Sequence, residues 1–123
     1  MKTHKDLNVW LDSRKLIVVT YQFTKDFLPK EELFGLSSQM RRASVSIASN
    51  IAEGSARQGK KEFVHFLYMA LGSLAELETQ YYVALDLKYT LSIDAVLESV
   101  VRIRKMLLGL IKFLKEQEEK NSF

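Results

Sequence analysis

The sequence predicts an all-α fold: an antiparallel, up-and-down bundle of four helices that forms a single domain over residues 1–123. Apolar residues recur at helical spacing in four long segments, which are joined by short connections. The chain has one proline and five glycines, too few for an all-β fold with many tight turns. Hydrophobic residues make up 47% of the chain and charged residues 27%, so the chain can bury one core and is too apolar for disorder.

The first predicted helix covers residues 7–28. A run of β-branched residues near its middle favours a strand, but the apolar pattern is longer than strands normally are. Pro29 ends the helix, because residues before a proline avoid helical geometry. The residues expected on or beside its buried stripe are Val9, Leu16, Val19, Phe23 and Phe27, with Trp10 and Ile17 at the edge.

The second predicted helix begins at Ser37 or Ser38, since either hydroxyl can accept a hydrogen bond from a free backbone N–H of the first turn. It ends before a turn at Gly59. Glu53 and Arg57 are four residues apart, in the order that favours an ion pair. The expected buried stripe contains Met40, Ala43, Ile47 and Ile51, and the polar face contains Arg42, Ser46, Asn50, Glu53 and Arg57.

The third and fourth predicted helices cover residues 60–87 and 93–119, and Thr90 or Ser92 is expected to cap the fourth. The expected buried stripe of the third helix contains Phe63, Leu67, Ala70, Leu74, Leu77 and Tyr81. That of the fourth helix contains Leu97, Val100, Leu107, Ile111 and Leu114.

The fourth helix has more apolar residues than the single stripe that a bundle helix buries. The surplus predicts self-association of the chain, with Val101, Arg104 and Leu108 as candidate interface residues. Arg104 lies inside the apolar row, so its side chain either extends past the row into solvent or forms a buried pair with Glu76 or Glu78.

The net charge of +3 is unevenly distributed along the chain. Residues 41–61 hold five bases and one acid, residues 62–98 hold one base and six acids, and residues 99–115 hold five bases and no acid. One interpretation is that neighbouring helices complement each other in charge. The other is that the basic segments form a nucleic-acid-binding surface, whose candidate contacts are Arg41, Arg42, Arg57, Lys60 and Lys61.

Motifs for catalysis are weak. The chain has no cysteine, which excludes disulfides and thiolate metal sites. Glu62-x-x-His65 matches one unit of a di-metal site, but the other histidine, His4, lies near the terminus, and His65 is expected to be half-buried. No nucleophile elbow or phosphate-binding loop occurs. We therefore expect no enzymatic activity, no cofactor, no metal and no small-molecule substrate. Since no apolar run approaches about 20 residues, we also expect a cytoplasmic protein without a membrane partner.

The segments Phe34–Ala43 and Ser46–Gly54 form a long motif, supported by Trp10, Leu28-Pro29, Ala70–Ser73 and Glu76–Glu78. With these residues the chain resembles the four-helix-bundle family of 23S rRNA-intervening sequence proteins. The resemblance implies a homopentameric barrel. It also implies a likeness to the accessory variability determinant of diversity-generating retroelements, which binds a reverse transcriptase and nucleic acid through a basic surface. The motif residues with a structural or interface role are Ser38, Gln39, Asn50, Glu53, Gly54, Gly72 and Glu76.

We expect a non-enzymatic, oligomeric protein that binds RNA, or a partner such as a reverse transcriptase, through the five basic residues. A scaffold that binds only proteins and a metal-dependent oxidase are the alternatives. Asn50 and Glu53 either pair with Arg41, Arg42 or Arg57, and so set the helix register or a subunit contact, or touch RNA directly. Gly72 and Ser73 are expected to permit close helix approach.

Overall fold

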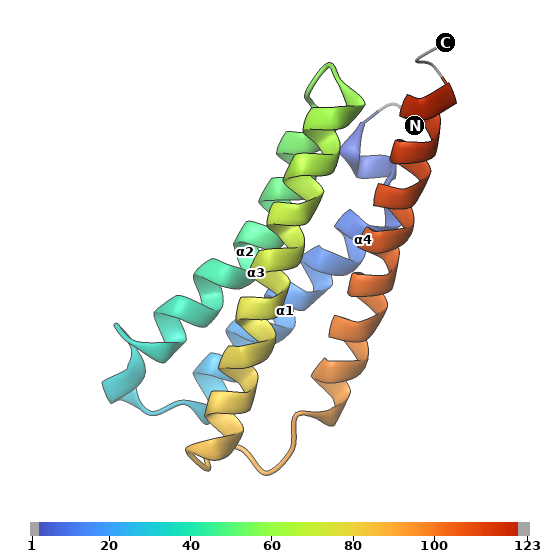
Figure 1. The fold of residues 1–123 in the computed structure, drawn as a ribbon. Helices are drawn as coiled ribbons and strands as arrows, with labels where there is room; N and C mark the ends of the chain where they lie inside the picture. Colours follow the sequence, from blue (N-terminus) through green and yellow to red (C-terminus); the bar gives the residue numbers. More distant parts are fainter. Residues whose placement is uncertain (1–2, 121–123) are drawn as a thin grey trace.

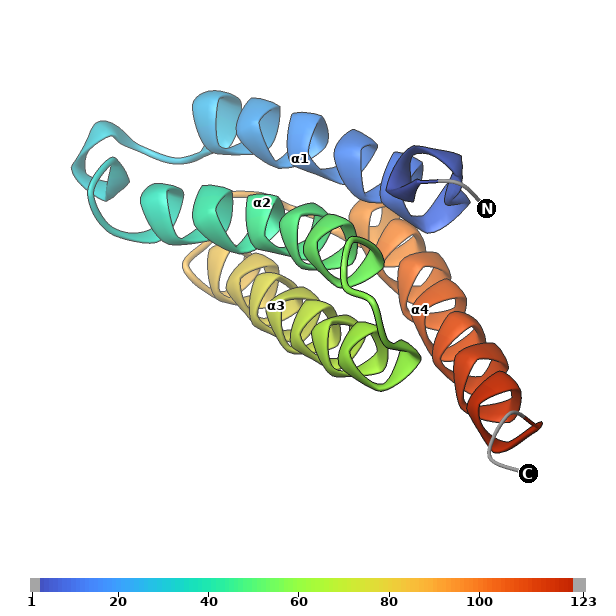
Figure 2. The ribbon, with the colours of Figure 1, turned by 90° about the horizontal axis from the view of Figure 1, so that it is seen from above.

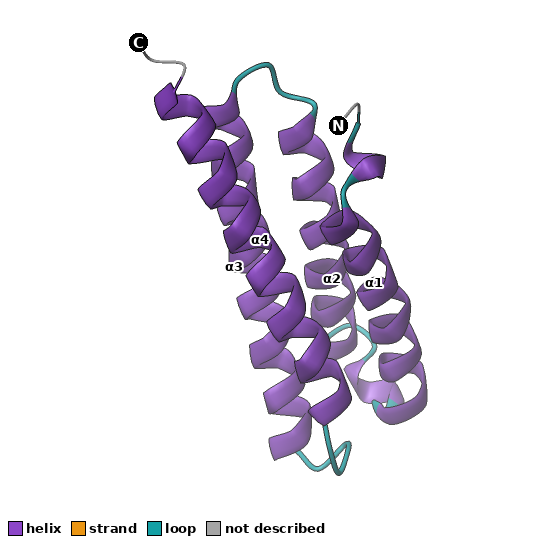
Figure 3. Cartoon of the chain, turned by 90° about the vertical axis from the view of Figure 1, so that its right-hand side faces the viewer, coloured by secondary structure: helices purple, strands orange, loops and turns teal. Residues whose placement is uncertain are grey.

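The computed structural model describes residues 3–120 and contains four long helices (Figure 1). They are α1 (Asn8–Phe27), α2 (Leu36–Ser55), α3 (Lys60–Asp86) and α4 (Asp94–Lys120), with the short 3-10 helices η1 (His4–Asp6) and η2 (Lys30–Glu32). No strand occurs in this described part, and the prediction of an all-α fold with four helices is confirmed (Figure 3). Within residues 3–120, no helix is sufficiently long and apolar to cross a membrane.

Each helix packs against the next one in the chain, and α4 packs against α1, so the four helices surround one core (Figure 2). Ser46 of α2 meets Ser73 of α3, whereas Gly54, further along α2, meets Phe66, earlier in α3. The two helices therefore run in opposite directions. The connections between α1 and α2 and between α3 and α4 lie at the same end of the molecule (Figure 1).

The predicted stripes of α2 and α3 are buried at every position: Met40, Ala43, Ile47 and Ile51 in α2, and Phe63, Leu67, Ala70, Leu74, Leu77 and Tyr81 in α3. In α4, Val100, Leu107, Ile111 and Leu114 are buried as expected, and Leu97 is half-buried. Val96 and Ile103 complete the buried face of α4. These helices follow simple apolar periodicity because their core-facing positions are almost all apolar.

The buried stripe of α1 differs from the prediction. Val19 and Phe27 are exposed, and the buried face alternates apolar residues with Ser13, Thr20 and Thr24. Each hydroxyl has a local or core partner: Ser13 Oγ donates to the Val9 carbonyl at 2.7 Å, and Thr24 Oγ1 donates to the Tyr21 carbonyl at 2.9 Å. Hydroxyls that are hydrogen-bonded in this way can be buried at little cost, and apolar periodicity does not detect them.

The start of α2 also differs from the prediction. The helix begins at Leu36, and neither Ser37 nor Ser38 caps it. Instead, Glu32 Oε1 accepts a hydrogen bond from the Leu36 N–H at 3.2 Å, and Tyr89 donates its hydroxyl to Glu32 Oε2 at 2.9 Å. That hydrogen bond to the carboxylate raises the pKa of Tyr89. One carboxylate from η2 thus caps α2 and joins the two connections at this end.

The start of α4 follows one of the two predicted alternatives. Ser92 Oγ accepts a hydrogen bond from the Asp94 N–H at 3.2 Å, while Thr90 donates its hydroxyl to the Ser92 carbonyl at 3.1 Å. Ser92 is therefore the cap, and Thr90 stabilises the connection before it.

Gly54 and Gly72 differ in how much space a side chain would find around them. A Cβ on Gly54 would lie 2.7 Å from Phe66 Cβ and 3.0 Å from a ring carbon of Phe63, so the missing side chain allows α2 to approach α3. A Cβ on Gly72 would meet nothing within 4 Å. The expectation of close approach at Gly72 is therefore wrong within one chain, whereas Ser73 does contact α2, through Ser46 at 2.9 Å.

The two glycine-to-alanine substitutions are expected to change stability in opposite directions. Gly72→Ala should raise the free energy of unfolding by about 0.5–1 kcal/mol, because alanine restricts the unfolded chain and finds open space. Gly54→Ala should lower it by about 1–3 kcal/mol, because the new methyl overpacks the α2–α3 contact. Urea unfolding measures both. A Gly54→Ala protein as stable as the original chain would contradict the close-approach argument.

The buried hydroxyl pair of Thr20 and Tyr81, 2.8 Å apart, is the second test of the fold. Thr20→Val leaves the Tyr81 hydroxyl buried without its partner and should cost about 1–3 kcal/mol, whereas Thr20→Val combined with Tyr81→Phe should recover part of that loss. A double variant that is less stable than both single variants would contradict a direct pairing.

The same pair predicts alkaline sensitivity. Burial raises the pKa of Tyr81 from 10.0 to about 12, although the hydrogen bond with Thr20 lowers it. Because the folded protein holds the neutral phenol, this contribution to stability is complete below pH 10 and is lost as the pH rises to about 12. Over this pH range, the free energy of unfolding should fall less steeply for Tyr81→Phe than for the original chain.

Candidate nucleic-acid interface

The five basic residues proposed as nucleic-acid contacts form two groups rather than one. Arg41 and Arg42 lie in the first third of α2, whereas Arg57 follows the end of α2, and Lys60 and Lys61 begin α3. A helical rise of about 1.5 Å per residue separates Arg42 from Arg57 by roughly 22 Å. The basic segment of the sequence is therefore not one patch on the folded chain.

Arg41 is a cation held in place by neutral groups. Its Nε donates to Thr24 Oγ1 at 2.8 Å, and its guanidinium carbon lies 4.7 Å from the centre of the Tyr21 ring. Within residues 3–120, the ion pairs involve other side chains and leave Arg41 without an acidic partner. The two terminal nitrogens of a half-buried, oriented guanidinium are thus available to an anion such as a phosphate.

Arg42 points to the opposite neighbour of α2. It lines a groove of about 400 Å³ between α2 and α3, whose other lining residues are Gln39, Ala43, Ser46, Glu76 and Gln80. The two adjacent arginines of α2 therefore lie at different helix–helix contacts: Arg41 contacts α1, and Arg42 faces α3.

The basic group at the other end is partly neutralised. Arg57 forms the predicted ion pair with Glu53 at 2.8 Å and lies 4.9 Å from the centre of the Phe66 ring. Lys60 and Lys61 line a groove of about 410 Å³ together with Lys115 of α4. The acids of that groove, Glu118 and Glu119, reduce its positive charge.

Sequence reasoning missed Lys115 as a member of this group. It is distant from Lys60 and Lys61 along the chain, but α3 and α4 run in opposite directions, which places the end of one helix beside the start of the other (Figure 3). Lys115 also donates to the Tyr68 hydroxyl at 3.0 Å. The predicted topology could have revealed that Lys115 lies beside Lys60 and Lys61, because an up-and-down bundle places residues near 60 next to residues near 115.

The family motif builds the contact between α2 and α3. Asn50 donates through Nδ2 to the carbonyl of Ser46 at 2.9 Å and to its hydroxyl at 3.1 Å, and Ser46 shares a hydrogen bond with Ser73 at 2.9 Å. Asn50 thus pairs with Ser46 and with no arginine in the described residues, and Glu53 pairs with Arg57. The expected pairing with an arginine therefore holds for Glu53 and not for Asn50. Both contacts join residues four apart along the chain, and direct contact of either residue with RNA stays a prediction.

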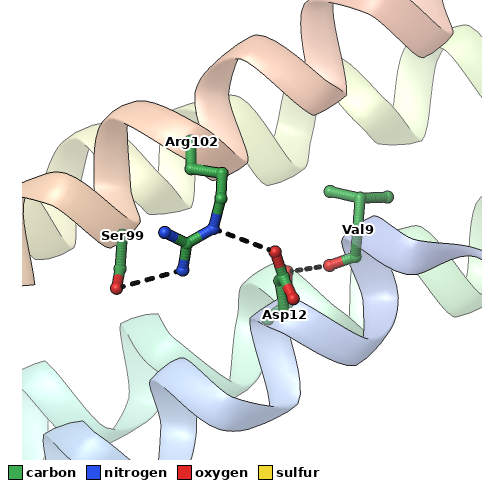
Figure 4. Close-up of polar contacts among 5 residues, drawn as sticks. Val9, Asp12, Ser99 and Arg102 are labelled. Atoms are coloured by element: carbon green, nitrogen blue, oxygen red, sulfur yellow. Dashed lines mark hydrogen bonds and ion pairs between the residues drawn. The ribbon is translucent and has the colours of Figure 1, made fainter.

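The bases of α4 are used in ion pairs between helices. Arg104 pairs with Glu78 at 2.5 Å, which selects Glu78 over Glu76. Arg102 pairs with Asp12 of α1 at 3.1 Å, and its terminal nitrogen lies 3.4 Å from the Ser99 hydroxyl (Figure 4). Charge complementarity between neighbouring helices is therefore formed at the contacts of α4 with α3 and α1.

The candidate interface residues Val101 and Leu108 remain 43% and 47% exposed, whereas Arg104 is half-buried through its pair with Glu78. Surplus apolar surface is not confined to α4, because Val18, Val19 and Phe27 of α1 are exposed as well. Large exposed apolar side chains thus occur on α1 as well as on α4, and α3 adds Tyr68, Met69 and Val83.

The sequence profile of the 23S rRNA-intervening sequence proteins matches residues 5–109. The chain belongs to this family. The match covers α1, α2 and α3 and continues into α4 as far as Gly109, beyond the motif that ends in α3. The comparison with curated proteins gave no match.

In this family member, the Glu62-x-x-His65 unit lies on the surface. His65 is exposed rather than half-buried, with its ring edge-on to Phe66 at 5.7 Å. Within residues 3–120, no group of three or more histidine, aspartate or glutamate side chains is placed to hold a metal ion.

Proposed function

We propose that this member of the 23S rRNA-intervening sequence protein family is a non-enzymatic, oligomeric protein of the cytoplasm that binds single-stranded or structured RNA through its phosphates. The observation that carries the proposal is Arg41, a guanidinium that is oriented by Thr24 and Tyr21 and that forms no ion pair in the described part of the chain. Orientation before binding lowers the entropy cost of capturing a phosphate. The family is named for intervening sequences of 23S rRNA, which makes RNA the first ligand to test.

The two basic groups have different parts in this proposal. Arg41 supplies a fixed phosphate contact, and Lys60, Lys61 and Lys115 supply a more mobile positive surface at the other end. Binding of this kind depends on release of counterions, so affinity falls steeply with salt and depends little on base sequence. Repetition of both groups around an oligomer would multiply weak contacts into useful affinity.

Replacement of Arg41 tests the phosphate contact. Arg41→Gln should weaken binding to a fluorescent single-stranded RNA by about fivefold to tenfold and reduce the salt slope by about one for each Arg41 engaged. Fluorescence anisotropy between about 50 and 200 mM salt measures both quantities.

Lys105→Gln is the matched control, because it removes one positive charge from an exposed position on α4. It should leave the affinity and the salt slope close to those of the original chain. If the original chain fails to bind RNA at low salt, or if both variants lose affinity equally, the assignment of Arg41 is wrong.

We further propose that the chain forms a closed ring, in which the exposed apolar face of α4 meets the exposed apolar face of α1 of the next copy. Two different faces that contact each other head to tail generate a ring when the rotation closes. The candidate residues on α4 are Val101 and Leu108, with Val18 and Val19 on α1. A pentamer is the size that the family resemblance implies.

Introducing a charge on each of the two apolar faces separates this arrangement from a two-fold dimer that uses only one of them. Leu108→Glu and Val18→Glu should each shift the mass measured by light scattering after size exclusion from the oligomer to the monomer, because a buried carboxylate lacks a partner. Lys112→Glu, an exposed change on α4, is the control and should keep the oligomer. An original chain that is a folded monomer at micromolar concentration would contradict the ring.

A protein-binding scaffold is the second candidate function, and one observation favours it. Phe34 and Leu91 are 93% and 97% exposed at the end of the bundle where Tyr89 and Glu32 join the two connections. Large exposed side chains on connections that are held together suit a protein partner. Capture from native lysate with and without nuclease distinguishes the two functions, because an RNA-mediated partner is lost on nuclease treatment.

A further inference from the structure

The polar groove between α2 and α3 is not explained by the fold or by the phosphate contact. α2 and α3 lie side by side along the bundle (Figure 2). The groove between them is lined by two charged and two amide side chains, whose polar groups can form hydrogen bonds with a base. Its charged side chains are Arg42 and Glu76, and its amides are Gln39 and Gln80.

Gln80 is the unusual member. Its side chain is only 7% exposed, and its Oε1 has no hydrogen-bond partner in the described residues. Buried amide oxygens are normally paired, so the unpaired Oε1 favours a turn of the Gln80 amide that brings it to an N–H donor in the adjoining groove. The remaining polar side chain, Ser46, is already occupied by Ser73 and Asn50.

The charged members of the groove are also without partners. Arg42 and Glu76 carry opposite charges on facing helices, yet neither belongs to an ion pair within residues 3–120. The groove therefore presents a free donor on α2, and a free carboxylate acceptor and a buried amide acceptor on α3.

We propose that this groove recognises an unpaired guanine base of the bound RNA, a proposal that rests on the RNA-binding function given above. Among the four bases, guanine alone presents two adjacent N–H donors on its Watson–Crick edge, together with an acceptor oxygen at O6. The carboxylate of Glu76 accepts both donors and Arg42 donates to O6, while Gln80 supplies a further acceptor once its amide turns toward the groove.

Proximity to Arg41 supports RNA as the source of the base. Arg41 and Arg42 are consecutive on α2 but about 100° apart around its axis, so a nucleotide whose phosphate is held by Arg41 has to extend across the exposed side of α2 to reach the groove lined by Arg42. Sequence-specific recognition of RNA acts mainly on unpaired bases, through hydrogen bonds to their edges. In this proposal, Arg41 positions the RNA through a phosphate, and Arg42 contacts the base.

Inosine provides the sharpest probe, because it retains O6 and N1–H and lacks only the amino group of guanine. We compare three adenine-rich single-stranded RNAs that carry guanine, inosine or adenine at one central position. The original chain should bind the guanine RNA at least about fivefold more tightly than the inosine RNA, in line with discrimination by one bidentate contact. The adenine RNA should bind no more tightly than the inosine RNA.

Glu76→Gln replaces the carboxylate with an amide and should reduce the preference for guanine over inosine to within twofold, while binding of the adenine RNA changes little. Glu98→Gln, the same charge change at an exposed position on α4, should retain the preference. Gln80→Leu should reduce the preference as well. Since Glu76 is exposed, its variant keeps the test valid even if Gln80→Leu fails to fold.

The outcomes separate the groove from the general function. RNA binding that is salt-dependent and sensitive to Arg41→Gln, with equal affinity for guanine and inosine, overturns the groove proposal and leaves the RNA-binding function standing. Absence of RNA binding at low salt overturns both. A Glu76→Gln protein with a changed oligomeric mass would assign the groove to a subunit contact and overturns its role in reading a base.

Discussion

The close approach of α2 and α3 is the constraint on which the rest of the structure depends. Gly54 brings the end of α2 against Phe63 and Phe66, and the hydrogen bond between Ser46 and Ser73 sets the register farther along the pair. Both contacts need small side chains, which explains why the motif in α2 is rich in serine, alanine and glycine. This register also determines which residues face each other across the polar groove.

Whether a basic residue forms an ion pair depends on the side chain that faces it from the neighbouring helix. Arg102 and Arg104 of α4 face acids on α1 and α3, so their charge is used in partly exposed ion pairs between helices, which contribute little to stability. Arg41 faces a tyrosine ring and a threonine hydroxyl instead, and its charge remains available. Arginines on different helices thus differ in their partners because different side chains face them from the neighbouring helices.

The apolar surface shows the same division between core and interface. Residues such as Leu107 and Ile111 are buried within the chain, whereas Val101 and Leu108 lie on the adjacent face of α4 and remain exposed. Val18 and Val19 form a comparable exposed face on α1. The fourth helix is apolar over more than one stripe, and one stripe lies in the core while part of the other stays exposed on the single chain.

Apolar periodicity, together with the proline, serine and glycine signals at the helix ends, determined the four helices, the limits of α1, α3 and α4 to within a residue, and the buried stripes of α2 and α3, because hydrophobic burial repeats with the helical turn. It misplaced the stripe of α1, where Ser13, Thr20 and Thr24 are buried through hydrogen bonds that no local pattern reveals. Only the tertiary structure decided which arginines stay free, and that Lys115 joins Lys60. Charge pairing depends on distances between helices, which a linear pattern does not contain.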